Sequence, residues 1–415
     1  MPRLAFFAYA YNLAEVTRAI EVAKACQARG AVVQFFTHGG THEARITEAG
    51  FDLTTLAPLI SPEKNKYLMD LDQGRALGQP FTFDEWCAQV DSELVALTGF
   101  SPDSVYAGMN LPSAITAKAA QVPLIYLLPL AGTLPYFQNK LAQFPSQYEN
   151  GLTRLVPKRW KDGVLNWLMP RVSVGLGVFN RAAKKFSVPP ARNLMDIIRG
   201  DLNLLTDIPE LTGLPAERLG DDFRYVGPVF ARLPEPIPEE VERVFRRDGL
   251  NIFCAMGSSG TPKELHAAVN ALRKSGHNAV IATTSILDPI ELGELPNNIY
   301  ATRYVPAPEV NEMADIALVH GGQGTVQTAC WAGTPVIGVG LQFEQETNLQ
   351  MLERAGMGIQ IPLRDYTEER IQTEIRRVAD NPSYKENAKR IQAIVRQSDG
   401  ASNAADEIFR FLKTN

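Results

Sequence analysis

The chain has 415 residues, of which 45% are hydrophobic and 21% charged, and this composition predicts a folded protein with room for two domains. A net charge of −5 without a basic stripe argues against nucleic acid as a partner. The cysteines lie far apart, without metal-ligand spacing, which indicates a reduced compartment and no structural metal; they are Cys26, Cys87, Cys254 and Cys330.

The first half of the chain predicts a parallel sheet. An apolar run at 4–10, an amphipathic stretch at 15–29 that ends on Gly30, and a second apolar run at 31–37 form a βαβ pattern. Similar runs begin at Asp103, Val122 and Leu202. The run from Val122 is the longest, and it falls short of the ~20 residues that span a bilayer. The N-terminus is also too short for a secretion signal, so we expect a cytoplasmic protein.

A second series of apolar runs predicts a second parallel sheet. These runs begin at Asn251, Asn278, Asn298, Asp315, Thr334 and Met357. After the first run, Thr261 and Pro262 are typical of a helix start, and Gly276 of a helix end.

A proline-rich stretch at 226–240 separates the two series and reads as a linker. We therefore expect an α/β protein with two Rossmann-like, doubly wound domains, at 1–225 and 241–395. The last residues, 396–415, predict a helix that packs back on the N-terminal domain. In such a fold the ligand site lies in the cleft between the carboxyl ends of the two sets of strands.

The loop HGGQGT, from His320 to Thr325, leads from a strand into a helix on this cleft. A helix start exposes unpaired N–H groups and the positive end of the helix dipole, which favour an anion. Gly321, Gly322 and Gly324 let a phosphate approach the backbone closely. The alternative is that these glycines only form a tight turn.

The spacing around this loop resembles the donor-binding signature of the UDP-glycosyltransferase superfamily, whose fold is called GT-B. The matching residues are His320-Gly-Gly-x-Gly-Thr, then Gly333-Thr-Pro335, then FEQETN with Glu344, Gln345 and Asn348. Three further segments resemble the family: AMGSSGT around Gly257, RYVPAPEV from Arg303 and YVGPVF from Tyr225.

The resemblance implies roles for the donor side of the cleft. His320 would contact a phosphate of the leaving diphosphate, while the helix start at Gly322, with Gly324 and Thr325, would donate to it. The other implied contacts are Ser258 or Ser259 over the phosphate, Tyr304 and Val305 at the nucleotide base, Thr328 at the ribose, and Glu344 with Gln345 at the sugar hydroxyls. The sugar nucleotide is then a co-substrate, and no cofactor or metal is expected.

Inverting transfer also needs a base for the acceptor's proton. The family places a histidine fifteen positions before the glycine that ends the first helix, and here that position, counted from Gly30, is Glu15. A free glutamate titrates near pH ~4.3, a helix start lowers this pKa and burial raises it. The alternative is that Glu15 is only a helix-start carboxylate. Asn12 is the second candidate, able to orient an acceptor but not to take its proton.

Two departures from the family pattern affect the expected site. The aspartate that orients the family histidine is missing, and its region offers only Asn110. Thr328 stands where the family has a ribose-binding glutamate, although Gln327 lies beside it. UDP is the first choice of nucleotide, TDP and GDP stay open, and a donor without ribose is conceivable.

The region from 130 to 167 lies where the family forms its acceptor pocket. It is rich in aromatic residues, and among them Tyr136 and Phe137, with Asn110, are the candidate acceptor contacts. They indicate an apolar acceptor, with ordinary core packing as the alternative. Lys158, Arg159 and Lys161 lie beside Trp160, a pattern that also fits contact with an anionic membrane surface.

The sequence thus predicts a metal-independent, inverting glycosyltransferase that moves a hexose from a UDP-sugar to a hydroxyl of an apolar small molecule or lipid. One alternative is a sugar-nucleotide epimerase, which shares the fold. The other is a non-catalytic nucleotide-sugar-binding or partner protein, which the missing family residues favour. The sequence does not indicate an oligomeric state.

Overall fold

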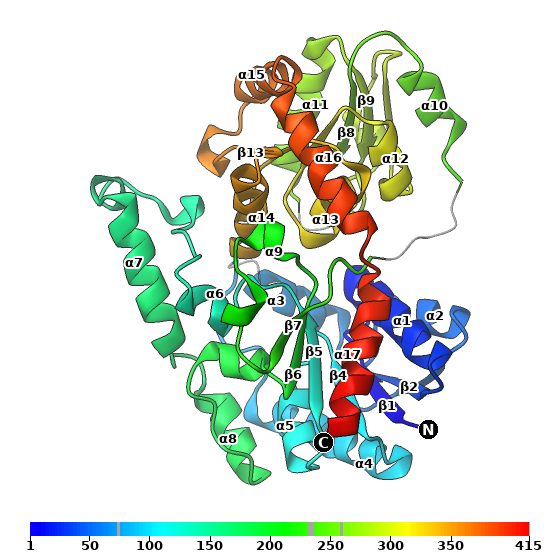
Figure 1. Ribbon diagram of the computed structural model, residues 1–415, viewed down its shortest axis with the longest axis vertical. Helices are drawn as coiled ribbons and strands as arrows, with labels where there is room; N and C mark the ends of the chain where they lie inside the picture. Colours follow the sequence, from blue (N-terminus) through cyan, green and yellow to red (C-terminus); the bar gives the residue numbers. More distant parts are fainter. Residues whose placement is uncertain (73–74, 231–235, 258–259, 415) are drawn as a thin grey trace.

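The structure is a computed structural model that describes residues 1–72, 75–230, 236–257 and 260–414. The chain folds into two α/β domains, each built on a parallel sheet, which lie one above the other in Figure 1. The predicted fold class is therefore confirmed. The apolar runs became strands because parallel strands are covered by helices on both faces.

Within the described residues, the first sheet has seven parallel strands in the order β3-β2-β1-β4-β5-β6-β7. Phe6 pairs with Phe35 on one side and Tyr106 on the other, and these rings fill the core under α1. The strands are β1 (Arg3–Phe7), β2 (Val32–Thr37), β3 (Asp52–Thr55), β4 (Ser104–Ala107), β5 (Leu124–Leu128), β6 (Leu202–Leu205) and β7 (Phe223–Tyr225).

The first helix begins where the side chain of Asn12 accepts a hydrogen bond from the Glu15 amide, at 3.2 Å. The α-helices of this domain are α1 (Leu13–Ala28), α2 (Glu43–Glu48), α3 (Pro62–Asp72), α4 (Phe83–Phe100), α5 (Ser113–Ala119), α6 (Leu134–Gln138), α7 (Lys158–Leu168), α8 (Gly177–Lys185) and α9 (Pro209–Thr212). Its 3₁₀ helices are η1 (Ser146–Tyr148), η2 (Thr153–Leu155), η3 (Met169–Arg171), η4 (Leu194–Ile198) and η5 (Ala216–Arg218).

The second sheet has six parallel strands among the described residues, in the order β10-β9-β8-β11-β12-β13. These are β8 (Asn251–Ala255), β9 (Asn278–Ala282), β10 (Ile299–Thr302), β11 (Ile316–Val319), β12 (Val336–Gly338) and β13 (Gly358–Gln360). Thr261 is the N-cap residue of α11, and Gly276 ends this helix at φ 73°, as the sequence predicted.

The helices of this second part are α10 (Glu239–Phe245), α11 (Pro262–Ser275), α12 (Ala307–Met313), α13 (Gln323–Ala332), α14 (Phe343–Arg354), α15 (Glu368–Ala379), α16 (Ser383–Arg396) and α17 (Gly400–Thr414), with η6 (Pro289–Leu292) and η7 (Leu363–Asp365). The last helix, α17, runs back along the first domain and packs on α1 (Figure 1). There Arg29 binds Asp406 at 2.8 Å and the hydroxyl of Ser402 at 2.7 Å. The last helix of the chain thus covers the first one.

Candidate active site

Each sheet has one point where the strand order reverses, and the candidate site residues lie at these two points. In the first sheet β1 and β4 are neighbours, and in the second β8 and β11 are. The crossover helices leave such a pair of strands in opposite directions, which opens a crevice at their carboxyl ends. Glu15 follows β1, and His320 follows β11.

The His320 ring is wedged between the ends of β8 and β11. A Cβ atom on Gly257 would lie 2.2 Å from its Cε1, and one on Gly322 would lie 2.4 Å from its Nε2. Burial lowers the pKa of His320 to about 4, opposed by the backbone of Ala255, so the ring is neutral at pH 7. Its Nδ1 is buried and has no hydrogen-bond partner among the described residues. A neutral imidazole here can donate one N–H to an anion without itself being a cation.

The first backbone amides of α13, beside this ring, have no carbonyl partner within their own helix. Gly322 is the N-cap, and the first intrahelical bond runs from the Val326 amide to the Gly322 carbonyl, at 3.0 Å. The amides of 323–325 therefore precede the hydrogen-bond ladder. Gly321 adopts φ 82°, and a Cβ there would meet the carbonyl of Gln345 at 2.7 Å, whereas one on Gly324 would meet nothing within 4 Å. Gly321 is required by the turn, and Gly324 faces open space.

The FEQETN segment forms the first turns of α14 and braces the glycine loop. Asn348 donates to the Gly321 carbonyl at 3.0 Å and to the Glu344 carboxylate at 2.9 Å. Gln345 is buried; its carboxamide accepts from the Leu341 amide at 2.9 Å and donates to the side chain of Gln342 at 2.9 Å. Glu344 lies beside the loop, while Gln345 holds the turn before its own helix.

The residues expected at the nucleotide lie around the same edge. Tyr304 follows β10 and is exposed, Val305 is partly buried beside it, and Thr325 bonds the Gly322 carbonyl at 2.8 Å. Thr328 is buried, donates to the Thr325 carbonyl at 3.0 Å and receives a bond from Asn311 at 3.3 Å. The expected phosphate contacts Ser258 and Ser259 lie outside the described residues.

Glu15 lies at the switch point of the first sheet, buried beside the ends of β1 and β4. Its Oε1 accepts from the Tyr9 amide at 2.8 Å, and a Cβ on Gly108 would lie 2.2 Å from that oxygen. Burial raises the pKa of Glu15 to about 7, although backbone bonds from Tyr9 and Met109 and the charge of Arg18 lower it. Oε2 has no hydrogen-bond partner of good geometry among the described residues. The carboxylate thus has one fixed oxygen and one that can accept a proton.

Asn110 belongs to a different polar cluster, centred on Glu93. Its amide donates to Glu93 Oε1 at 2.6 Å and to Ser113 at 2.7 Å, and His38 Nε2 lies 3.3 Å from the same carboxylate oxygen. Asn110 therefore follows β4, as the family aspartate would, but it does not orient Glu15. Asn12 uses its side chain as the α1 cap.

The two domains are joined by three residues that sequence reasoning did not single out, namely Arg18, Gln323 and Thr206. Arg18 donates to the Gln323 side chain at 2.6 Å, and Gln323 donates to the Thr206 hydroxyl at 2.5 Å. Asp207 accepts from the Leu130 amide at 2.6 Å, and burial raises its pKa to about 6. The helical spacing of Arg18 from Glu15 was the one available signal, because it puts both near the same face of α1.

Tyr136 and Phe137 are fully buried in the contact between α6 and α14. The Tyr136 hydroxyl donates to Thr347 at 3.2 Å, and the Phe137 ring lies parallel to Phe343 with centroids 6.1 Å apart. Both rings thus contact the second domain as well as the core of the first. Their expected role at an acceptor stays a prediction.

A cavity of about 20 Å³ lies between the domains, lined among others by Asp207, Gln323 and Asn348. A larger one, of about 800 Å³, lies beside the end of α17, and neither Glu15 nor His320 lines it. Within the described ranges, no helix is long and apolar enough to cross a membrane. The same part of the chain shows no cluster of three or more metal-binding side chains.

The chain is similar in sequence and in fold to known proteins. Residues 269–406 match the family described as erythromycin biosynthesis protein CIII-like, C-terminal domain. An NDP-glycosyltransferase, YjiC, of Bacillus subtilis is 24% identical over 74% of this chain and 72% of its own. The chain is a GT-B glycosyltransferase.

Another relative also matches most of this chain in sequence. A PGL/p-HBAD biosynthesis rhamnosyltransferase of Mycobacterium bovis is 25% identical over 79% of it and 71% of the relative. The crystal structure of the glycosyltransferase VinC in complex with DTDP has a TM-score of 0.71, 16% identity, and full coverage of both chains. The predicted resemblance to the UDP-glycosyltransferase superfamily is confirmed at the level of fold and enzyme class.

Proposed function

We propose that this glycosyltransferase moves a hexose from a nucleoside diphosphate donor to a hydroxyl of an apolar small molecule or lipid, in one inverting step. The observation that supports the proposal is that Glu15 and His320 each lie at the switch point of a sheet, one in each domain. Glu15 is the proposed proton acceptor, and the loop after His320 is the proposed anion site. Arg18 and Gln323 link them across the domains. The chemistry needs these two functions and no cofactor.

In this mechanism the acceptor hydroxyl gives its proton to Glu15 Oε2 as its oxygen attacks the anomeric carbon. The bond between that carbon and the diphosphate oxygen breaks, and the negative charge moves to the leaving group. Amides at the start of α13, together with the neutral His320 ring, stabilise that charge. Arg18, which reaches Gln323 at the same place, adds a positive charge from the opposite domain.

Several donor contacts follow the family pattern in this proposal. Tyr304 and Val305 receive the base, Thr328 one ribose hydroxyl, and Glu344 the sugar, with Gln345 positioning that turn. UDP is the first choice of nucleotide, and TDP is the alternative that the DTDP complex of VinC favours. The names of the relatives support a nucleoside diphosphate sugar as the donor class.

The test is a calorimetric titration of the protein with UDP, TDP and GDP, followed by nucleotide release from the matching sugar nucleotides with a panel of phenols and lipid alcohols. We expect one diphosphate to bind and acceptor-dependent release to follow. Binding without release above the background of Glu15→Gln, with every acceptor, would favour the non-catalytic binding protein. Acceptor-independent conversion of the sugar would favour the epimerase.

A further inference from the structure

Helix α7 turns polar side chains towards the protein on its inner side and an apolar stripe towards solvent on its outer side. On the inner side, Asp162 accepts from the Phe144 amide at 2.7 Å. Asn166 is buried and pairs with both backbone groups of Ala142, at 3.2 and 2.7 Å. A helix that packs on a protein core normally turns its apolar stripe inwards. The inner contacts of α7 are made by these polar groups and by the half-buried Leu165, so the exposed stripe on the other side is not needed to hold the helix.

The outward stripe is large and continuous. Trp160 and Trp167 are 63% and 61% exposed, and Val164 and Leu168 complete a spacing of i, i+4, i+7 and i+8 along one helix face. The preceding turn adds the exposed side chains of Leu152, Leu155 and Val156. In Figure 1 α7 stands at the side of the molecule, away from both sheets. An apolar patch of this kind, unlike single exposed side chains, indicates a surface that docks on something apolar.

The charges around this stripe select the partner. Residues 150–171 contain five lysines and arginines and one aspartate, in a chain whose net charge is −5. Lys158 and Arg159 are exposed at the start of the helix, and Arg171 lies over the Trp167 ring at 4.9 Å. Tryptophans beside cations are the composition of helices that lie in the headgroup region of anionic bilayers.

We propose that residues 152–168, the outward face of α7 with its preceding turn, dock onto the surface of an anionic lipid bilayer. The tryptophan rings and aliphatic side chains enter the headgroup region, while Lys158 and Arg159 contact lipid phosphates. The docking is independent of the transfer reaction, because it involves none of the residues around Glu15 and His320.

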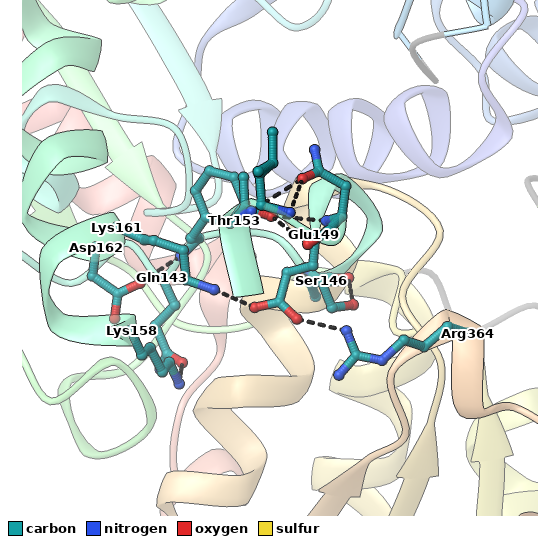
Figure 2. A network of polar contacts seen from close by, with 12 residues as sticks. Gln143, Ser146, Glu149, Thr153, Lys158, Lys161, Asp162 and Arg364 are labelled. Carbon is teal, nitrogen blue, oxygen red and sulfur yellow. Dashed lines mark hydrogen bonds and ion pairs between the residues drawn. The ribbon is translucent and has the colours of Figure 1, made fainter. Parts of the chain in front are cut away.

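The docking face is tied to the donor-binding domain. Figure 2 shows the Glu149 carboxylate between Lys161 of α7 and Arg364, which belongs to η7 of the second domain. Beside it, the Ser146 amide donates to Glu346 of α14 at 2.8 Å. Docking therefore fixes the orientation of the donor domain and its cleft relative to the bilayer. An enzyme that takes an apolar acceptor gains from such an orientation, since the acceptor concentrates in the lipid.

The experiment is sedimentation of the full chain with vesicles of phosphatidylcholine alone and of equal parts phosphatidylcholine and phosphatidylglycerol. We expect binding to the anionic vesicles that weakens with added salt. The double variant Trp160→Ser/Trp167→Ser should bind about tenfold or more weakly, because both rings leave the headgroup region. The matched control Val95→Ser/Ile290→Ser changes side chains that are 74% and 87% exposed elsewhere, and should bind like the wild type.

Lys158→Glu/Arg159→Glu should abolish the preference for anionic vesicles while nucleotide binding stays unchanged. Vesicle binding that is unaffected by the tryptophan variant would overturn the proposal. The absence of vesicle binding would also overturn it. If sedimentation velocity then found a dimer that the tryptophan variant dissociates, the face would be a contact between two copies of the chain. The vesicle-binding readouts use neither a sugar nucleotide nor an acceptor, so their outcome is separate from that of the transfer assay.

Discussion

At the scale of single residues, the protonation state of Glu15 decides whether it can act as a base. Its pKa is raised to about 7 by burial, from 4.5, so the carboxylate form grows as the pH rises through neutrality. Glu15→Gln keeps the shape and the Tyr9 contact but cannot accept a proton. We expect transfer to fall by ~10²–10⁴-fold with diphosphate affinity unchanged, as measured by initial rates and calorimetry. A variant with near-native rates would assign Glu15 a structural role.

The same pKa shift makes a prediction about stability. Because the native pKa of Glu15 lies above the unfolded value, the native state holds the extra proton, and stability falls as the pH rises from about 4.5 through 7. This group alone removes up to roughly 3 kcal/mol across that window. Glu15→Gln should therefore be more stable than the wild type at pH 8 and similar at pH 4.5, in urea unfolding. Equal stability of the two proteins at pH 8 would contradict the burial of this charge.

Arg18 carries the positive charge that faces the α13 start. Arg18→Ala should raise the Kd for a nucleoside diphosphate about tenfold, since a charge-assisted contact is lost. Arg18→Lys keeps the charge but loses the planar guanidinium group that bonds Gln323. Its Kd should lie between those of the wild type and Arg18→Ala. Titration calorimetry at low and high salt measures both, and a salt-independent loss in Arg18→Ala would point to packing instead of charge.

At the scale of elements, Gly321 and Gly324 of the same loop are expected to serve different purposes, one structural and one in binding. Gly321→Ala puts a Cβ into the Gln345 carbonyl at φ 82°, and should destabilise the protein by about 1–3 kcal/mol. Gly324→Ala meets nothing within 4 Å, so it should leave stability unchanged and weaken diphosphate binding, because the methyl group covers the phosphate's approach. Thermal unfolding and calorimetry on both variants separate the two effects. Normal diphosphate binding by Gly324→Ala would contradict the proposal that this glycine lets a phosphate approach the backbone.

Strands and helices could be predicted where the local sequence carries an apolar run or a signal for a helix end. Strands buried on both faces produced apolar runs, and α11 carried its own start and stop signals. Two edge strands were missed: β3 is polar and half exposed, and β7 has three residues, so neither has a run to recognise. Glu15 was predicted by counting fifteen positions back from Gly30 on the family pattern, and the His320 loop by its glycine spacing before a helix; their roles stay predictions. The contact of Arg18 was not predicted, since it arises only when helices from the two domains meet.

At the scale of the whole molecule, α17 joins the end of the chain to its beginning. Ile408 is buried in the core cluster of the first domain beneath α1, whereas Ile290 is almost fully exposed. Ile408→Ala should cost about 2–5 kcal/mol, and Ile290→Ala should cost almost nothing. Urea unfolding of the two variants provides the comparison. Equal stabilities would mean that α17 does not pack on the first domain in solution.

The central claim is that the start of α13 receives a diphosphate opposite Glu15. Its most direct test is a crystal structure of the protein with UDP or TDP. We predict phosphate oxygens within hydrogen-bond distance of the amides of Gly324 and Thr325 and of the His320 ring, with Glu15 Oε2 facing the space next to the β-phosphate. A nucleotide bound elsewhere, or a diphosphate at α13 with Glu15 separated from it by packed side chains, would contradict the claim.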